Sequence, residues 1–328
     1  MRAVQVTRLD GPDAVEVVEV EEPAGRPGQV VVETRAAGVN FPDVLLTRGE
    51  YQMRPTPPFV PGSEVAGVVR SAPAGSGFEA GQRVAAFPGM GGFAEVVAAD
   101  PIAVFPLPDK VSFEVAAAFP MNYLTVHFAF TRRGRLAPGE TVLVHGAAGG
   151  IGTAGIQMAK ALGARVIAVV SSEAKGEVAR AAGADEVIGV DGFKDAAKQL
   201  TGGRGVDVVL DPVGGERFTD SLRSLAVEGR LLVIGFTGGE IPTVKVNRLL
   251  LNNIEVVGVG WGAFWVGDPA YLQSQWRDLM PLVEQGRLDP PIGGTYPLEQ
   301  AAAALREIAD RRATGKLLLI PGGAADGS

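Results

Sequence analysis

The chain has 328 residues, of which 46% are hydrophobic and 20% charged, so it can bury a large core, and its length favours two domains over one. Its net charge of −7 comes from scattered residues of both signs, without the basic stripe that would track a nucleic acid backbone. It contains no cysteine, which excludes disulfides, thiolate catalysis and thiolate zinc sites.

The N-terminal part, from Met1 to about Pro108, shows short apolar alternations broken by glycine and proline, as in AVEVVEVEEP and EVAGVVRSA. This pattern predicts a β-rich, partly open barrel with long loops. The opening MRAVQVTRLDG lacks an apolar signal core, and no run approaches the length of a membrane span. We therefore expect a soluble cytoplasmic protein.

From about Phe119 the pattern changes to strands that alternate with segments of helical period, which predicts a doubly wound parallel sheet. The expected strands are Thr141 to His145, Arg165 to Ser171, Glu186 to Val190, Val206 to Leu210, Arg230 to Ile234 and Ile254 to Val259. A last helix, EQAAAALREIADRR, and a last strand, GKLLLIP, cannot bury a core alone, so we expect them to pack on the N-terminal domain.

A glycine cluster follows the first of these strands and precedes a helix. Gly146 to Gly152, GAAGGIG, matches the dinucleotide fingerprint with alanine in place of its first glycine. Gly149 would let the backbone approach a pyrophosphate, and Gly152 would let the helix pack closely on the strand. The alternative is a tight turn in an α/β protein that binds no dinucleotide. The residues expected to hold the cofactor are Ala148, Gly149, Gly150, Ile151 and Gly152.

The end of the second strand bears on which cofactor is bound. A site for a free ribose 2′-hydroxyl has Asp or Glu about 20 residues beyond the glycines, but here the strand ends in Val170, Ser171 and Ser172. Ser171, Ser172 and Lys175 can donate to a 2′-phosphate, which predicts NADPH. Glu173 opposes this interpretation unless its side chain points to solvent. The alternative is that the serines only cap the next helix.

Several blocks, among them AAGVNFPDVLLTRGEY, PFVPGSEVAGVV, HGAAGGIGTAGIQMAKALGA and RRATGKLLLIP, resemble a zinc-independent quinone oxidoreductase of the medium-chain dehydrogenase/reductase superfamily. The resemblance implies a GroES-like β-rich catalytic domain from residues 1–118 and 263–328, and a Rossmann domain from residues 119–262. It further implies NADPH in the cleft between them and a homodimer. Asn40 and Ser63 stand where the zinc alcohol dehydrogenases have Cys and His, and they are poor zinc ligands, so we expect no metal.

The same resemblance implies a set of site residues. Those near the nicotinamide and the substrate are Asn40 and Tyr51, and the further cofactor contacts are Thr125, Ser171, Lys175, Phe236, Thr237, Gly238 and Arg312.

Hydride transfer to a quinone or an α,β-unsaturated carbonyl develops negative charge on oxygen, so the site needs a hydrogen-bond donor there. Tyr51 and the amide of Asn40 are the candidates, and a bound water could deliver the proton instead. Tyr51 could instead pack on the neighbouring prolines, and Asn40 could be a turn residue. Asp43 is expected to cap a helix, and His145 to be structural.

The expected activity is NADPH-dependent reduction of quinones. The alternatives are reduction of α,β-unsaturated carbonyls, such as 2-alkenals or enoyl thioesters, and a non-catalytic NADPH-binding sensor or structural protein.

Overall fold

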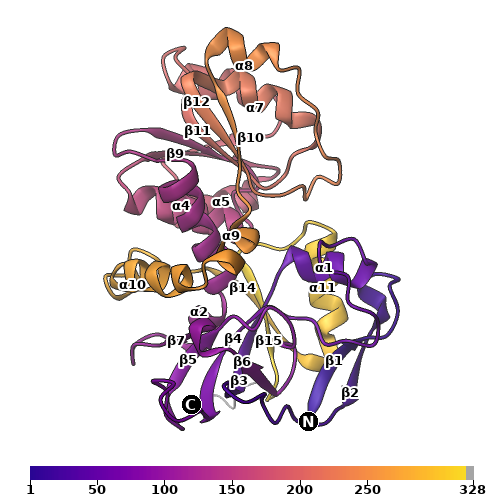
Figure 1. Cartoon of the computed structure of the whole chain (residues 1–328). Coiled ribbons are helices and arrows are strands. Elements are labelled where there is room, and N and C mark those ends of the chain that lie inside the picture. The colour runs from indigo at the N-terminus through magenta and orange to yellow at the C-terminus, as the bar shows by residue number, and fades with distance from the viewer. Residues whose placement is uncertain (323–328) are drawn as a thin grey trace. The chain divides into compact units, whose positions relative to one another are not determined.

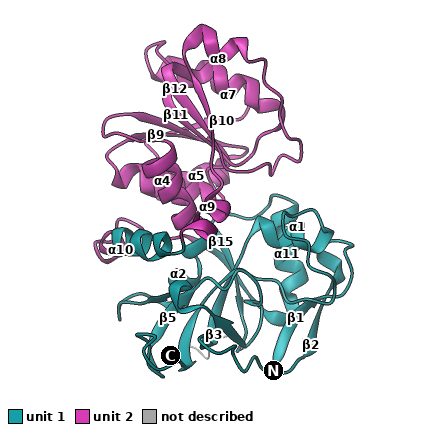
Figure 2. Cartoon of the chain, viewed as in Figure 1, with its two compact units in different colours: residues 1–121, 269–280, 292–328 teal, residues 122–268, 281–291 magenta. Residues whose placement is uncertain are grey.

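A computed structural model describes residues 1–322, which form two compact units (Figure 2). The first unit comprises residues 1–121, 269–280 and 292 onward, and the second comprises residues 122–268 and 281–291. The divisions therefore fall after residues 121 and 268, a few residues later than the expected ends at 118 and 262. Residues 281–291 were expected in the first unit, but they belong to the second.

Side-chain hydrogen bonds explain this division. Trp276 stacks on Phe105 at 4.6 Å between ring centroids and donates from Nε1 to the carbonyl of Pro106, which holds residues 269–280 on the first unit. Gln157 donates to the carbonyl of Asp289 at 2.7 Å and accepts from its N–H at 2.9 Å. This pair of bonds holds residues 281–291 on the second unit.

The first unit is a mostly antiparallel sheet whose strands run in the order β14-β15-β3-β4-β5-β7, with β6 also paired to β3 and a separate β1-β2 ribbon (Figure 1). Its elements are β1 (Arg2–Val6), β2 (Val15–Glu19), β3 (Val30–Val39), α1 (Phe41–Arg48), β4 (Glu64–Ser71), β5 (Arg83–Ala86), β6 (Val96–Ala99), β7 (Val104–Pro106), α2 (Phe113–Ala117), α10 (Ala270–Glu284, which continues into the second unit), β14 (Ile292–Pro297), α11 (Ala301–Ala309) and β15 (Lys316–Ile320).

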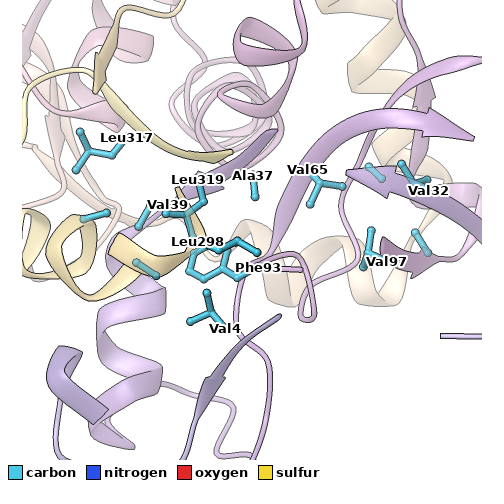
Figure 3. Close-up of a cluster of buried hydrophobic side chains, with 14 of the residues drawn as sticks. Val4, Val32, Ala37, Val39, Val65, Phe93, Val97, Leu298, Leu317 and Leu319 are labelled. Carbon is cyan, nitrogen blue, oxygen red and sulfur yellow. The ribbon is translucent and has the colours of Figure 1, made fainter. Parts of the chain in front are cut away.

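The C-terminal strand completes this sheet, as the sequence predicts. Residues Leu317 to Leu319 of β15 pair antiparallel with Ala37 to Val39 of β3. Leu317 and Leu319 join Val4, Val39 and Phe93 in one buried cluster (Figure 3). The two ends of the chain therefore share a hydrophobic core, because neither end could bury its apolar side chains alone.

The second unit has a parallel sheet of six strands in the order β10-β9-β8-β11-β12-β13. Its elements are α3 (Thr125–His127), β8 (Thr141–Val144), α4 (Gly150–Ala161), β9 (Arg165–Val170), α5 (Glu173–Ala181), β10 (Glu186–Gly189), α6 (Phe193–Leu200), β11 (Val206–Asp211), α7 (Phe218–Ser224), β12 (Leu225–Val233), α8 (Asn247–Asn252), β13 (Glu255–Gly258) and α9 (Trp261–Gly267). All six predicted strands are confirmed, and only β12 begins several residues before its predicted start.

This strand order places a topological switch point between β8 and β11, where chain connections leave in opposite directions. Ligands of open α/β sheets bind outside the carboxyl ends of the strands at such a point. The turn after β8 is the glycine cluster.

Among the helices of residues 1–322, none has both the length and the apolar character that a membrane span requires.

His145, directly after β8, is fully buried and structural, as expected. Its Nε2 lies 2.8 Å from the hydroxyl of Ser221, which itself donates to the carbonyl of Arg217 at 3.0 Å. The single hydroxyl proton is thus used, so Nε2 must donate and the neutral ring leaves Nδ1 unprotonated. Nδ1 has no partner among the described residues. Burial, with help from the nearby Arg217, lowers the pKa of His145 to about 3.

This neutral histidine makes folding sensitive to acid. Between pH 6.5 and 3 the unfolded chain binds a proton that the folded chain refuses, so stability falls as the pH falls, by about 2 kcal/mol at pH 5. We expect His145→Gln to remove this loss. The test compares the free energy of unfolding of both proteins from pH 7 to pH 5, where groups common to both cancel. Parallel curves would contradict the prediction.

Candidate functional site

The glycine turn between β8 and α4 leaves backbone donors unused. A Cβ on Gly152 would lie 2.2 Å from the carbonyl oxygen of Gly146, so this position admits only glycine. At Gly149 a Cβ would meet nothing closer than 3.5 Å, so the space beside it is open. Gly150 and Ile151 begin α4, and their N–H groups and that of Gly152 make no hydrogen bond to any residue in 1–322. Ala148 is buried beneath the turn. These N–H groups at a helix N-terminus can bind an anion.

The end of β9 bears no carboxylate aimed at this turn. Val170 is buried, Ser171 is exposed, and the hydroxyl of Ser172 caps α5 by accepting from the N–H of Lys175 at 3.4 Å. The cap interpretation is therefore correct for Ser172. Glu173 accepts from Arg180 at 2.7 Å, which turns its carboxylate along α5 and lowers its pKa. The objection to a phosphate beside Lys175 is thereby weakened.

Asn40 belongs to a buried polar cluster in the first unit. Its side-chain oxygen accepts from the ammonium of Lys316 at 2.6 Å, and its side-chain nitrogen donates to Glu64 at 2.8 Å. Lys316 also donates to the same Glu64 oxygen, and the other Glu64 oxygen accepts from the N–H of Met121 at 2.6 Å. A Cβ on Gly38 would lie 2.5 Å from that carboxylate, so the glycine of β3 makes room for the cluster.

Asp43 borders the cluster and fixes the start of α1. Its carboxylate accepts from the N–H of Asn40 at 2.8 Å and from the N–H of Gly62 at 3.2 Å, which confirms that Asp43 caps a helix. Burial raises the pKa of Asp43 to about 7, although both N–H groups and Lys316 favour the carboxylate. Lys316 is 3% exposed and Glu64 is fully buried, so each charge depends on the other.

Tyr51 follows α1 and packs its ring beside Val6, Leu46 and Phe59. The hydroxyl makes no hydrogen bond to any described residue. Burial, and then the charge of Asp43, raise its pKa, so the hydroxyl keeps its proton at neutral pH. It can donate a hydrogen bond there.

The remaining predicted residues lie in several places. Thr125 is buried at the start of α3. The N–H and hydroxyl of Thr237 both donate to the carbonyl of Pro212, and the N–H of Gly238 donates to the carbonyl of Val213. These bonds hold the loop that includes Phe236 over the turn after β11.

Arg312 is exposed and pairs with Asp310 at 3.0 Å. The buried cation of the C-terminal segment is Lys316 instead.

The residues at the zinc positions do not suit that metal. Asn40 and Glu64 both bind the ammonium of Lys316, whose charge would repel a second cation. The hydroxyl of Ser63 is buried without a partner in the described chain. Residues 1–322 contain no group of three or more His, Asp or Glu side chains that could hold a metal ion.

Neither Lys316 nor Glu64 is among the site residues predicted from the sequence. One signal was present, since Lys316 opens the otherwise apolar final strand KLLLI. A lysine inside a buried strand requires a buried anion. Nothing in the sequence, however, indicates which carboxylate pairs with it.

Comparisons with known proteins cover most of the chain. Residues 26–109 match the family model described as alcohol dehydrogenase GroES-like domain, and residues 150–285 match that described as zinc-binding dehydrogenase. The quinone oxidoreductase-like protein 2 of Rattus norvegicus is 39% identical over 322 residues, which are 97% of this chain and 91% of that protein.

Solved structures agree with these matches. A probable oxidoreductase from Mycobacterium abscessus is 48% identical, with a TM-score of 0.91 over 98% of this chain and 99% of that one. The quinone oxidoreductase of Thermus thermophilus, solved alone and in complex with NADPH, is 38% identical, with a TM-score of 0.85 over 98% of this chain and 100% of that one.

The buried ion pair leads to a stability prediction. Lys316→Met removes the ammonium and leaves Glu64 as a buried charge, so we expect a loss of about 3 to 5 kcal/mol in the free energy of unfolding. Adding Glu64→Gln should recover part of this loss, because the two residues are directly coupled. Denaturant unfolding of the single and double variants measures the coupling.

Arg312→Met is the matched control, since it removes an exposed, paired cation from the same segment. It should change stability by about 0.5 kcal/mol or less. Strictly additive losses at Lys316 and Glu64 would contradict the prediction.

Proposed function

Because the chain belongs to the medium-chain dehydrogenase/reductase superfamily, with quinone oxidoreductase-like relatives, we propose that it is an NADPH-dependent oxidoreductase that transfers hydride to quinones without zinc. The observation that carries the proposal is the glycine turn at the sheet's switch point, where α4 begins with unpaired N–H groups and Gly149 leaves open space. Backbone donors with a helix dipole behind them are suited to a pyrophosphate.

The preference for NADPH is supported by the end of β9. An acceptor for the ribose 2′-hydroxyl is missing at Val170, and Glu173 is held by Arg180. Ser171 is exposed and Lys175 lies in the first turn of α5, where both can reach a 2′-phosphate. A phosphate bound there would gain charge-assisted hydrogen bonds. Thr125, Phe236 to Gly238 and Arg312 are proposed as further cofactor contacts.

When bound, NADPH supplies the hydride, and the protein must stabilise the negative charge that develops on the acceptor oxygen. We assign this donor role to Tyr51, since its hydroxyl is protonated and has no partner among the described residues. Asn40 is the second candidate. Its side-chain oxygen is occupied by Lys316, and one amide hydrogen faces Glu64. The other hydrogen makes a long hydrogen bond of 3.4 Å to the carbonyl of Gly38, which a bond to a ligand could replace.

Two further features inferred from the sequence are proposed as well. A homodimer is supported by the edge position of β13 and by the exposed Leu250 and Leu251 of the neighbouring α8. Sedimentation as a monomer at micromolar concentration would refute the homodimer.

The cytoplasmic location is tested by fractionation of cells that produce the protein.

Turnover of NADPH tests the proposed activity. We expect the purified, metal-free protein to oxidise NADPH with benzoquinones or naphthoquinones faster than with 2-alkenals or enoyl-CoA esters. Gly149→Val is the control, because its side chain would fill the open space beside the turn and abolish turnover. Faster turnover of an activated alkene would replace the substrate class. Binding without any turnover would favour a non-catalytic NADPH-binding protein.

The cofactor preference is tested separately. Lys175→Ala should lower kcat/KM for NADPH at least about tenfold relative to NADH, since a charge-assisted hydrogen bond to the 2′-phosphate is lost. Lys198→Ala on α6 removes the same charge from another helix and should leave the ratio unchanged. Equal losses with both cofactors in the Lys175 variant would overturn the assignment.

A further inference from the structure

Asn122 lies beside the N-terminus of α4 and was not among the predicted site residues. It belongs to the π-helical segment Pro120–Leu124, and only 5% of its surface is exposed. Its amide nitrogen would be 2.5 Å from a Cβ on Gly150, whereas its amide oxygen would be 3.4 Å away. The side chain therefore covers the first residue of α4 with its nitrogen foremost.

The amide of Asn122 makes no hydrogen bond to any residue that the structure describes. The amide is not among the fully buried side-chain atoms that lack a partner, so water or a ligand can reach it. Here the amide nitrogen adds donors to the unpaired N–H groups of Gly150, Ile151 and Gly152. Donors that gather without an acceptor repel one another weakly, and an anionic oxygen would satisfy all of them at once.

We infer that Asn122 is a further cofactor-binding residue, whose side-chain amide donates to the pyrophosphate of the dinucleotide at the N-terminus of α4. The inference rests on the proposed NADPH-dependent function and adds a side chain to a site built of backbone groups. It also explains why α4 begins with glycine, since any Cβ at position 150 would displace this amide.

Two substitutions test the inference. Asn122→Ala should weaken NADPH binding about tenfold, because one hydrogen bond to a charged group is lost. Asn122→Asp keeps the shape but places a carboxylate beside the phosphates, so we expect about a hundredfold loss or more. Asn252→Asp on α8 introduces the same charge at an exposed site and should leave the affinity unchanged.

Three ligands locate the contact. The dissociation constant is measured by titration for NADPH and for 2′-phospho-ADP-ribose, which retains the pyrophosphate and lacks nicotinamide, and by competition for adenosine 2′-monophosphate. The Asn122 variants should weaken the first two ligands equally and leave the third unchanged, with melting temperatures near that of the wild type.

The outcomes separate the two proposals. Three outcomes would overturn the role of Asn122 and leave the proposed function standing. The first is wild-type affinity for NADPH in Asn122→Asp. The others are a loss of affinity for NADPH alone, and a loss of affinity that extends to adenosine 2′-monophosphate. A wild-type protein that binds neither dinucleotide ligand would overturn the proposed function itself.

Discussion

The first unit depends on one buried interaction, in which the ammonium of Lys316 lies between the side chains of Asn40 and Glu64. Lys316, on the last strand, reaches Asn40 and Glu64, which lie more than 250 residues earlier. Neither charge could remain buried without the other, since removing an ion from water costs several kcal/mol. The pair therefore ties β15, which lies between β14 and β3, to the start of β4, and through Asn40 it fixes the junction of β3 and α1.

The cluster also has a consequence for chemistry. Its polar atoms satisfy one another, with the oxygen of Asn40 on Lys316 and the two oxygens of Glu64 shared among an amide, an ammonium and a backbone N–H. Such a network holds the Asn40 side chain in one orientation. The oxygens of Asn40 and Glu64 are therefore both bonded to the protein's own cation.

The second unit shows the opposite arrangement, in which donors lack acceptors. The start of α4 presents backbone N–H groups, and the amide of Asn122 faces the same turn. Donors left unpaired among residues 1–322 at a helix N-terminus can bind an anionic ligand. The cluster around Lys316 thus pairs its charges internally, whereas the start of α4 leaves donors that a cofactor can use.

Local pattern in the sequence determined much of this protein. The alternation of strand and helix predicted six parallel strands, and the glycine spacing predicted the turn, because both depend on neighbouring residues. Only the tertiary structure decided that Lys316 pairs with Glu64, that Glu173 turns to Arg180, that residues 281–291 join the second unit, and that Asn122 covers Gly150. Each depends on which distant or competing side chains meet in space, and sequence spacing does not encode that choice.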